Sequence, residues 1–400
     1  MKWYPNYIPE ILIALKEIFE NNKQADKYIQ FLLKKNKKWG SRDRKFVSKV
    51  LYDIVRWKKY YAFLAQSNLS TIEGKKKILT VWSLLHQVPI PNELFFSDIS
   101  LQKIEERKKQ PIPSDIFFSL PTWLYKLVSE QLGEHKWQQE LKALNREAEL
   151  VIRVNTLKIS RNQLIEILKK ENIDVYTLPD YPDALFLNKK YPLTQTKFYK
   201  KGYFEIQDAS SQLVSPFTGA KPGMTVIDAC AGGGGKTLHL AAQMGNKGEI
   251  LAYDINPKKI KELLTRIKRN GVKNITDVAI ITPEIVKRNK NKADILLIDA
   301  PCSSIGTLRR KPGLKWQLSS KKIKHINAIQ KDILTNYEIM LKPGGSLIYV
   351  TCSILPEENE KMIHNFLQKK KKYTFVSDKT IYPSSMQGDG FYMAKLLKKT

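Results

Sequence analysis

The 400-residue sequence predicts a helical N-terminal region, a small α/β segment and a doubly wound, mostly parallel α/β sheet. Hydrophobic residues recur at helical spacing over the first 140 residues. Near Glu149 the pattern changes to mixed strands and helices, and from Lys221 strand-like runs alternate with helical stretches. Such alternation is typical of a parallel sheet with a ligand crevice at the carboxyl ends of its strands. We therefore predict domains at 1–140, 141–215 and 216–400.

The first region has the periodicity of a helical bundle. Apolar side chains three and four residues apart would form one buried face of each helix, as in the sets Ile8, Ile11, Leu12, Leu15, Ile18, Phe19 and Phe46, Val50, Ile54, Trp57. The proline-containing stretches "QVPIPNEL" and "KKQPIPSDIFFSLP" indicate connections between helices.

The rest of the chain supplies the strands. In the small segment, "LVIRVNTLK" is strand-like, "SRNQLIEILKKEN" indicates a capped helix, and "GYFEIQDASSQLV" indicates a strand that enters a helix. In the last region the strand-like runs are MTVIDA, GEILAYD, NITDVAI, ADILLIDA, GGSLIYVT, YTFVS and FYMAKLL.

The net charge favours a polyanionic partner. The chain has 68 Lys and Arg against 39 Asp and Glu, a formal charge of +29. A field of that sign attracts nucleic acid, although a genome rich in Lys, Ile and Asn codons would also add lysines. The sequence has no long basic amphipathic segment for a membrane surface, no apolar run near the about 20 residues that cross a bilayer, and no secretion signal at its start. We expect a cytoplasmic protein that does not bind membranes.

The cysteines and histidines argue against a metal site. The three cysteines are far apart, no CxxC or HExxH pattern occurs, and reduced thiols are expected. Each cysteine, at 230, 302 and 352, follows an apolar strand-like run. We predict no structural metal and ask what the thiols do at strand ends.

A glycine loop indicates a cofactor site. "DACAGGGGKT" combines a strand end, four consecutive glycines and a helix start, and Asp254 ends the next strand, where an acid can bind ribose hydroxyls. A P-loop would need glycine at position 230, and a dinucleotide motif would need glycine at 237 or 238. Two interpretations remain, an S-adenosylmethionine site and a tight strand-to-helix turn without a ligand, and the four consecutive glycines favour the first.

A thiol beside a methyl donor suggests one reaction, the methylation of carbon 5 of a pyrimidine. A thiolate that adds to carbon 6 makes carbon 5 nucleophilic, and an acid near ring N3 assists the addition. Asp299 and Cys302 follow one predicted strand, and Cys352 follows another. The residues alone do not distinguish the roles of these two cysteines. Cys230, inside the glycine loop, is interpreted as a small packing residue.

The motifs resemble those of a known family. "DAPCSSIGTLRRKPGLKW" and "TCSILPEENE" resemble the two signature motifs of the RNA 5-methylcytosine methyltransferases, and "RVNTLK", "QDASSQL", "DACAGGGGKT" and "DGFYMAKL" resemble other blocks of that family. The likeness spans about 150–400 and implies a Rossmann-like, seven-stranded sheet. "RDRKFVSKVLYDIVRW" and "LPTWLYKLVSEQLG" are similar to the NusB-like RNA-binding domain of the small-subunit ribosomal RNA methyltransferase B branch.

The resemblance implies residue roles. Cys352 matches the nucleophile, Cys302 the cysteine that assists product release, and Asp299 the acid that faces the base beside the cofactor. Asp254 matches the ribose acid, and the implied cofactor loop comprises Cys230, Ala231, Gly232, Gly233, Gly234, Gly235 and Lys236.

Two departures from the family pattern concern the cofactor. The loop usually reads Ala-Ala-Pro-Gly-Gly, so the four glycines predict more backbone freedom. The family also carries an acid after the third strand for the adenine, and no acid is present near Ile281 and Thr282.

The residue types themselves suggest RNA contacts, and the resemblance implies the substrate. Arg309, Arg310 and Trp316 are candidates for holding phosphates and stacking on a base, against the alternative of a solvated basic loop. The "EENE" run at 357–360 is interpreted as negative charge at a helix start. The implied enzyme methylates a cytidine of small-subunit ribosomal RNA, free or in an assembly intermediate, and we expect it to be a monomer. A transfer RNA enzyme and a catalytically weak NusB-like RNA-binding protein are the alternatives.

Overall fold

The computed structural model describes residues 2–400, which divide into two compact units. Among the described residues, one unit comprises 2–146 with 307–320, and the other comprises 147–306 with 321–400. The segment that follows Cys302 thus continues from the second unit into the first. No helix within residues 2–400 is long and apolar enough to span a membrane.

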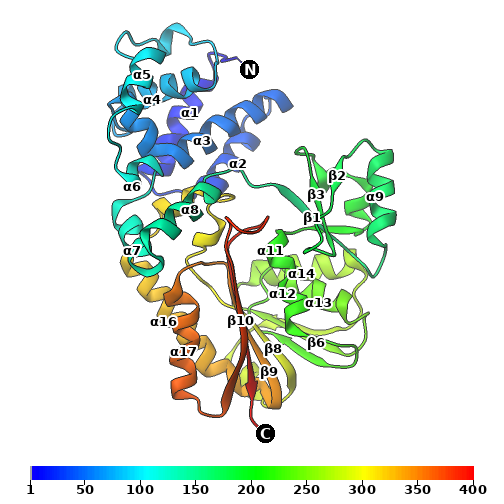
Figure 1. Ribbon diagram of the computed structural model, residues 1–400. Coiled ribbons are helices and arrows are strands. Elements are labelled where there is room, and N and C mark those ends of the chain that lie inside the picture. The colour runs from blue at the N-terminus through cyan, green and yellow to red at the C-terminus, as the bar shows by residue number, and fades with distance from the viewer. Residues whose placement is uncertain (1) are drawn as a thin grey trace. The chain divides into compact units, whose positions relative to one another are not determined.

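The first unit is helical, as the sequence predicts (Figure 1). Its core combines the periodic apolar residues of the long helices with Trp3, Trp39 and Trp82. Helix α3 carries a kink at Trp57, where the backbone leaves helical geometry. The helices are α1 (Tyr7–Phe19), α2 (Ala25–Lys35), α3 (Ser41–Ala65), α4 (Ile72–Leu85), α5 (Leu101–Lys108), α6 (Ser114–Phe117), α7 (Thr122–Leu132) and α8 (Glu134–Leu144), with the 3₁₀ helices η1 (Asn92–Leu94) and η4 (Pro312–Trp316).

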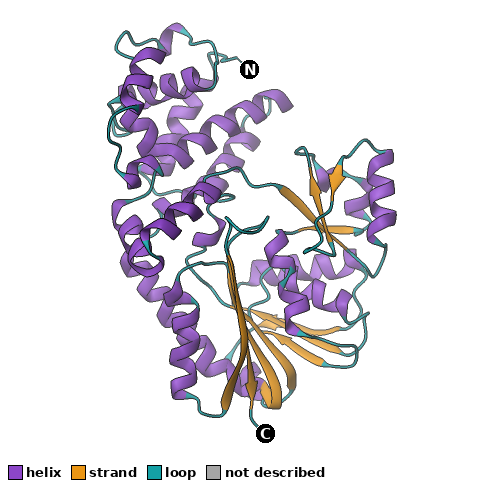
Figure 2. Cartoon of the chain, in the orientation of Figure 1, coloured by secondary structure: helices purple, strands orange, loops and turns teal. Residues whose placement is uncertain are grey.

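The second unit begins with a small antiparallel sheet in the order β2-β3-β1-β4, seen as a separate group of orange strands in Figure 2. The predicted helix at 161–170 carries the capping box of Ser160 and Gln163. The elements are β1 (Leu150–Val154), α9 (Arg161–Lys170), β2 (Val175–Tyr176), β3 (Ala184–Leu187), η2 (Leu193–Gln195), α10 (Lys197–Lys200), β4 (Phe204–Ile206), α11 (Ala209–Gln212) and α12 (Val214–Thr218).

The large sheet has seven strands in the order β10-β11-β9-β8-β5-β6-β7. All neighbours from β9 to β7 are parallel, whereas β11 pairs antiparallel with β9 and β10. The strands are β5 (Thr225–Asp228), β6 (Glu249–Asp254), β7 (Ile275–Ile280), β8 (Ala293–Asp299), β9 (Leu341–Thr351), β10 (Tyr373–Ile381) and β11 (Phe391–Lys398). The predicted fold class is therefore confirmed.

Helices cover both faces of this sheet (Figure 1). Alternate residues of β5 show the two faces, because Val226 packs with α12 and α13 while Ile227 packs with α15, α16 and α17. The helices and 3₁₀ helices are α13 (Gly235–Gln243), α14 (Pro257–Asn270), α15 (Pro283–Arg288), α16 (Ser320–Tyr337), α17 (Glu360–Lys369), η3 (Ile305–Thr307), η5 (Glu338–Met340) and η6 (Pro356–Glu358). The strand order reverses between β5 and β8, which places the expected ligand crevice beyond their carboxyl ends.

Candidate active site

The glycine loop joins β5 to α13 and is braced on several sides. Gly234 has a φ of +85°, and a Cβ added there would lie 2.2 Å from a methyl carbon of Leu263, so only glycine fits. The carbonyl of Gly235 accepts a hydrogen bond from the buried Arg153 at 2.5 Å, and that of Gly233 accepts one from Arg266 at 2.6 Å. These two arginines restrain a loop whose four glycines predict more backbone freedom.

Asp254 lies beside this loop at the end of β6. Its Oδ2 accepts a hydrogen bond from the Gly232 N–H at 2.8 Å, and its Oδ1 accepts one from the Asn256 N–H at 2.8 Å. The carboxylate is therefore held at the edge of the loop by backbone donors from both sides. A Cβ at Gly232 would meet nothing within 4 Å, so space is open on that side of the loop.

Lys236 and Asp299 form an ion pair across the ends of β5 and β8. The Lys236 Nζ lies 2.6 Å from the Asp299 Oδ2. Burial lowers the pKa of Lys236, but the Asp299 carboxylate outweighs that effect and the net pKa is raised. The Lys236 side chain is 10% exposed and that of Asp299 is 31% exposed, so a substrate can reach the carboxylate. Burial also raises the pKa of the neighbouring Asp228, at the end of β5, to about 7.

The two candidate cysteines lie together. Cys302 Sγ is 3.3 Å from Cys352 Sγ, and Ser304 Oγ is 3.2 Å from Cys352 Sγ. The hydrogen bond from Cys302 is the largest influence that lowers the pKa of Cys352, with Ser304 and Lys236 adding to it against burial. The same hydrogen bond, with burial, raises the pKa of Cys302. Of the two thiols, Cys352 is thus the one that ionises more readily.

Comparison with known proteins places this chain in a family. A model described as "16S rRNA methyltransferase RsmB/F" matches residues 218–397, and one for the ferredoxin-like domain of RsmF/B-like methyltransferases matches 120–194. The ribosomal RNA small subunit methyltransferase B of Salmonella paratyphi A is 33% identical over 293 residues, covering 72% of this chain and 68% of the relative. The chain belongs to the RsmB/F family. It is an S-adenosylmethionine-dependent RNA methyltransferase.

Two solved structures share this fold. The crystal structure of PH0851 has a TM-score of 0.81 and 25% identity, and the likeness covers 100% of both chains. A methyltransferase homologue from Pyrococcus horikoshii has a TM-score of 0.63 and 27% identity over 71% of this chain and 97% of that one. The helical residues before 120 lie outside both matched family models, so the NusB-like character of that region stays a prediction.

The residues around the glycine loop fit S-adenosylmethionine. The open space beside Gly232, the start of α13 and the Asp254 carboxylate provide room for the cofactor, backbone N–H donors and an acceptor for ribose hydroxyls. Cys230 belongs to the same loop, and burial raises the pKa of its thiol well above the usual range. Its side chain packs against the sheet core, in agreement with a packing role.

The adenine side differs from the family pattern described above. The buried Ile281 follows β7, and the Thr282 hydroxyl caps α15 by accepting a hydrogen bond from the Ile285 N–H. Asp277 lies within β7 but accepts hydrogen bonds from Tyr253 and Arg288. No carboxylate stands at the end of this strand.

The predicted RNA-contact residues lie in the helical unit. The Trp316 indole donates to the Val55 carbonyl at 2.7 Å and packs edge-on against Phe19. Arg309 is 6% exposed and its carbonyl accepts a hydrogen bond from Arg56, whereas Arg310 is half-buried. These contacts explain the position of the Trp316 side chain without any RNA contact. Contact between RNA and the three side chains remains a prediction.

Sequence reasoning missed a set of buried polar residues around the thiols. Glu358 and Asn359, interpreted as helix-start charge, are both fully buried. Ser303 and Ser353, which directly follow the two cysteines, are buried as well. The available signal in the sequence is that a serine follows each of the two cysteines. If these serine hydroxyls are buried with the thiols, they need hydrogen-bond partners nearby.

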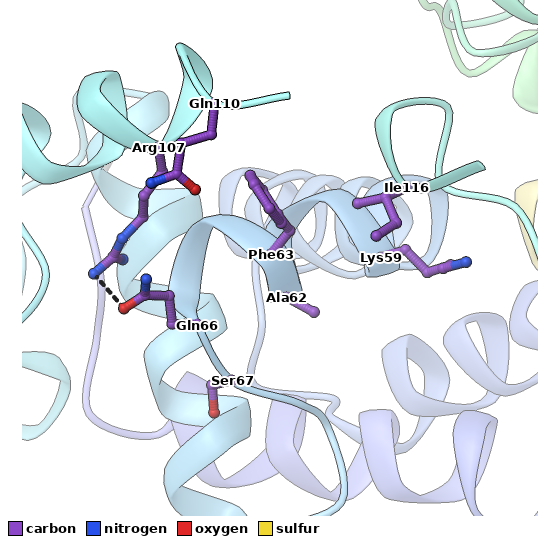
Figure 3. Close-up of a pocket in the computed structure, with 8 residues that line it drawn as sticks. All are labelled: Lys59, Ala62, Phe63, Gln66, Ser67, Arg107, Gln110 and Ile116. Atoms are coloured by element: carbon purple, nitrogen blue, oxygen red, sulfur yellow. Dashed lines mark hydrogen bonds between the residues drawn. The ribbon is translucent and has the colours of Figure 1, made fainter. Parts of the chain in front are cut away.

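The structure also shows a cavity of about 390 Å³ in the helical unit (Figure 3). Its lining includes Phe63, Gln66, Arg107 and Lys59. Arg107 donates to Gln66 at 3.0 Å, and Lys59 pairs with Asp115. Both cations thus serve the packing of the helices around the cavity. Within residues 2–400 no group of three His, Cys, Asp or Glu side chains could hold a metal ion.

Proposed function

We propose that this enzyme methylates carbon 5 of a cytidine in small-subunit ribosomal RNA through a covalent bond between Cys352 and carbon 6. The observation that carries the proposal is the 3.3 Å approach of the two thiols at the ends of β8 and β9. The 33% identical relative acts, by its name, on small-subunit ribosomal RNA. The formal charge of +29 suits an RNA partner.

The proposed reaction begins at Cys352. Its thiolate adds to carbon 6, and the electron pair of the 5,6 double bond moves so that carbon 5 becomes nucleophilic. S-adenosylmethionine supplies an electrophilic methyl group when it is bound. Negative charge that builds at ring N3 draws a proton from Lys236 through Asp299, whose side chains lie 2.6 Å apart.

Product release then needs a proton to leave carbon 5 and the sulfur to leave carbon 6. Water takes up the proton that leaves carbon 5, and the electron pair of that bond restores the 5,6 double bond and expels Cys352 as a thiolate, while N3 returns its proton through Asp299 to Lys236. Cys302 lies 3.3 Å from that sulfur and donates a hydrogen bond to the departing thiolate. This contact supports the release role that the family motif implies for Cys302.

Two alternatives make different predictions about the modified RNA. Bisulfite sequencing of total RNA is compared between the parent strain, a deletion strain and the deletion strain that carries the gene on a plasmid. The comparison reports every 5-methylcytosine that is lost. The proposal expects one or more sites lost from small-subunit ribosomal RNA, restored by the wild-type gene and not by Cys352→Ala. If 5-methylcytosine is lost only from transfer RNA, transfer RNA is the substrate. If it is lost at no site, an RNA-binding protein without catalysis is favoured.

A further inference from the structure

A buried carboxyl joins the loops that carry the two thiols. The Glu358 Oε1 accepts a hydrogen bond from the Ser303 N–H at 2.7 Å, and its Oε2 accepts one from the Ser303 hydroxyl at 2.5 Å. The Ser353 hydroxyl also hydrogen-bonds to Glu358 and lies 3.2 Å from the Ser303 Oγ. The donors come from the residues immediately after Cys302 and Cys352.

The neighbouring contacts hold Glu358 itself in place. The Tyr349 hydroxyl donates to the Glu358 carbonyl at 2.8 Å. Asn359 accepts a hydrogen bond from the Thr351 hydroxyl at 2.6 Å and donates to the Ser353 carbonyl at 3.0 Å. Residues 358 and 359 therefore fix both sides of Cys352 and one side of Cys302. A carboxylate that only placed negative charge at a helix start could remain exposed to solvent and would need none of these contacts.

We propose that Glu358 is a positioning residue, which holds the Cys302 and Cys352 loops at the separation where one thiol donates to the other. An isolated buried carboxyl is costly, and here three donors from two loops offset that cost. Displacement of a reacting group by about 1 Å can lower a rate about 100-fold, so a clamp on both loops matters for catalysis. The effect on catalysis rests on the proposed function.

Glu358 also acts on Cys302 through its charge. Hydrogen bonding to Cys352 and burial raise the pKa of Cys302, and the negative charge of Glu358 adds to the rise. A protonated Cys302 can donate to Cys352. A change at Glu358 therefore alters the position and the ionisation of the same thiol pair.

Glu358→Gln tests the clamp with little change in volume. Its amide nitrogen cannot accept a hydrogen bond, so one oxygen must serve both donors of Ser303. We expect the kcat of methyl transfer to fall about 10- to 100-fold, with KM for RNA and cofactor within about twofold. Glu357→Gln, an adjacent change of the same kind, controls for charge at this turn. Glu358→Asp should recover part of the loss.

Two further readouts separate positioning from general stability. In a double-mutant cycle, Ser303→Ala and Glu358→Gln should together lose little more than the worse single variant, because they remove one shared interaction. Without RNA, alkylation of Cys352 by iodoacetamide, followed against pH by mass spectrometry of the thiol peptides, should move to higher pH in Glu358→Gln.

An unchanged kcat, a loss confined to KM, or a kcat loss matched by a fall in the folded fraction would overturn the role of Glu358. The alkylation result does not depend on RNA chemistry. An unshifted alkylation profile in Glu358→Gln would therefore reject the clamp, whether or not the wild type forms an RNA adduct. If the profile shifts but the wild type forms no RNA adduct, only the proposed function is rejected.

Discussion

Cys302 Sγ lies 3.3 Å from Cys352 Sγ, although fifty residues separate the two cysteines in the chain. The parallel pairing of β8 and β9 produces this proximity, since Asp299 stands opposite Val350 in the register. Two thiols so close differ in ionisation: the hydrogen bond from Cys302 lowers the pKa of Cys352, while that of Cys302 is raised.

The first prediction concerns this asymmetry. Removal of the Cys302 donor in Cys302→Ala should raise the pKa of Cys352, so its alkylation by iodoacetamide shifts to higher pH. The sign follows because the hydrogen bond that is removed favours the charged form. Cys230→Ala is the matched control, and an alkylation profile that does not shift in Cys302→Ala would contradict the pairing.

The second prediction concerns Asp254. Asp254→Ala removes the acceptor expected for the cofactor ribose and leaves the Gly232 N–H without its partner. We expect cofactor affinity to fall about 5- to 150-fold, or about 1–3 kcal/mol. Calorimetric titration of the folded variant measures this, and binding as tight as in the wild type would assign the acid another role.

The third prediction separates packing from RNA contact at Trp316. The half-buried indole packs with Phe19 and donates to Val55, so Trp316→Ala should lower the free energy of unfolding by about 2 kcal/mol. Thermal denaturation checks this, and Arg310→Gln serves as the comparison. If Trp316→Ala kept full stability but bound RNA more weakly, base stacking would be the better account.

The fourth prediction concerns the charge of the helical region. Residues 1–146 contain 26 Lys and Arg against 15 Asp and Glu. Replacing the exposed Lys37, Lys38 and Lys45 by Gln should weaken RNA binding and make its salt dependence shallower. The slope of the logarithm of the binding constant against the logarithm of the salt concentration should fall by about 0.7–0.9 for each phosphate that a lysine no longer neutralises. An unchanged slope would remove these lysines from the RNA interface.

The sequence predicts the large sheet well because its strands are short apolar runs followed by turn residues. Each of the seven runs overlaps a strand, from β5 at MTVIDA to β11 at FYMAKLL, although β9, β10 and β11 extend beyond their runs. The short strands β2 and β3 escaped prediction, since they pair within a loop-rich stretch around Tyr176 and Phe186.

Side-chain partners at the site are harder to predict than strands. That Cys302 and Cys352 share one sheet edge follows from the pattern of strands. The Glu358 contacts depend on tertiary packing, because an acid before a helix usually stays exposed, and here the loop turns it inward. Likewise, nothing local to Arg153 or Arg266 shows that they bind carbonyls of the glycine loop.

The covalent adduct is the most direct test of the proposed chemistry. Wild type, Cys352→Ala and Cys302→Ala are incubated with labelled substrate RNA and S-adenosylmethionine and then resolved on a denaturing gel. We expect a retarded protein–RNA band with Cys302→Ala, which adds and methylates but releases slowly, and none with Cys352→Ala, which transfers no methyl. A band with Cys352→Ala and none with Cys302→Ala would reverse the two roles, and intact methylation in both variants without any band would contradict the thiol mechanism.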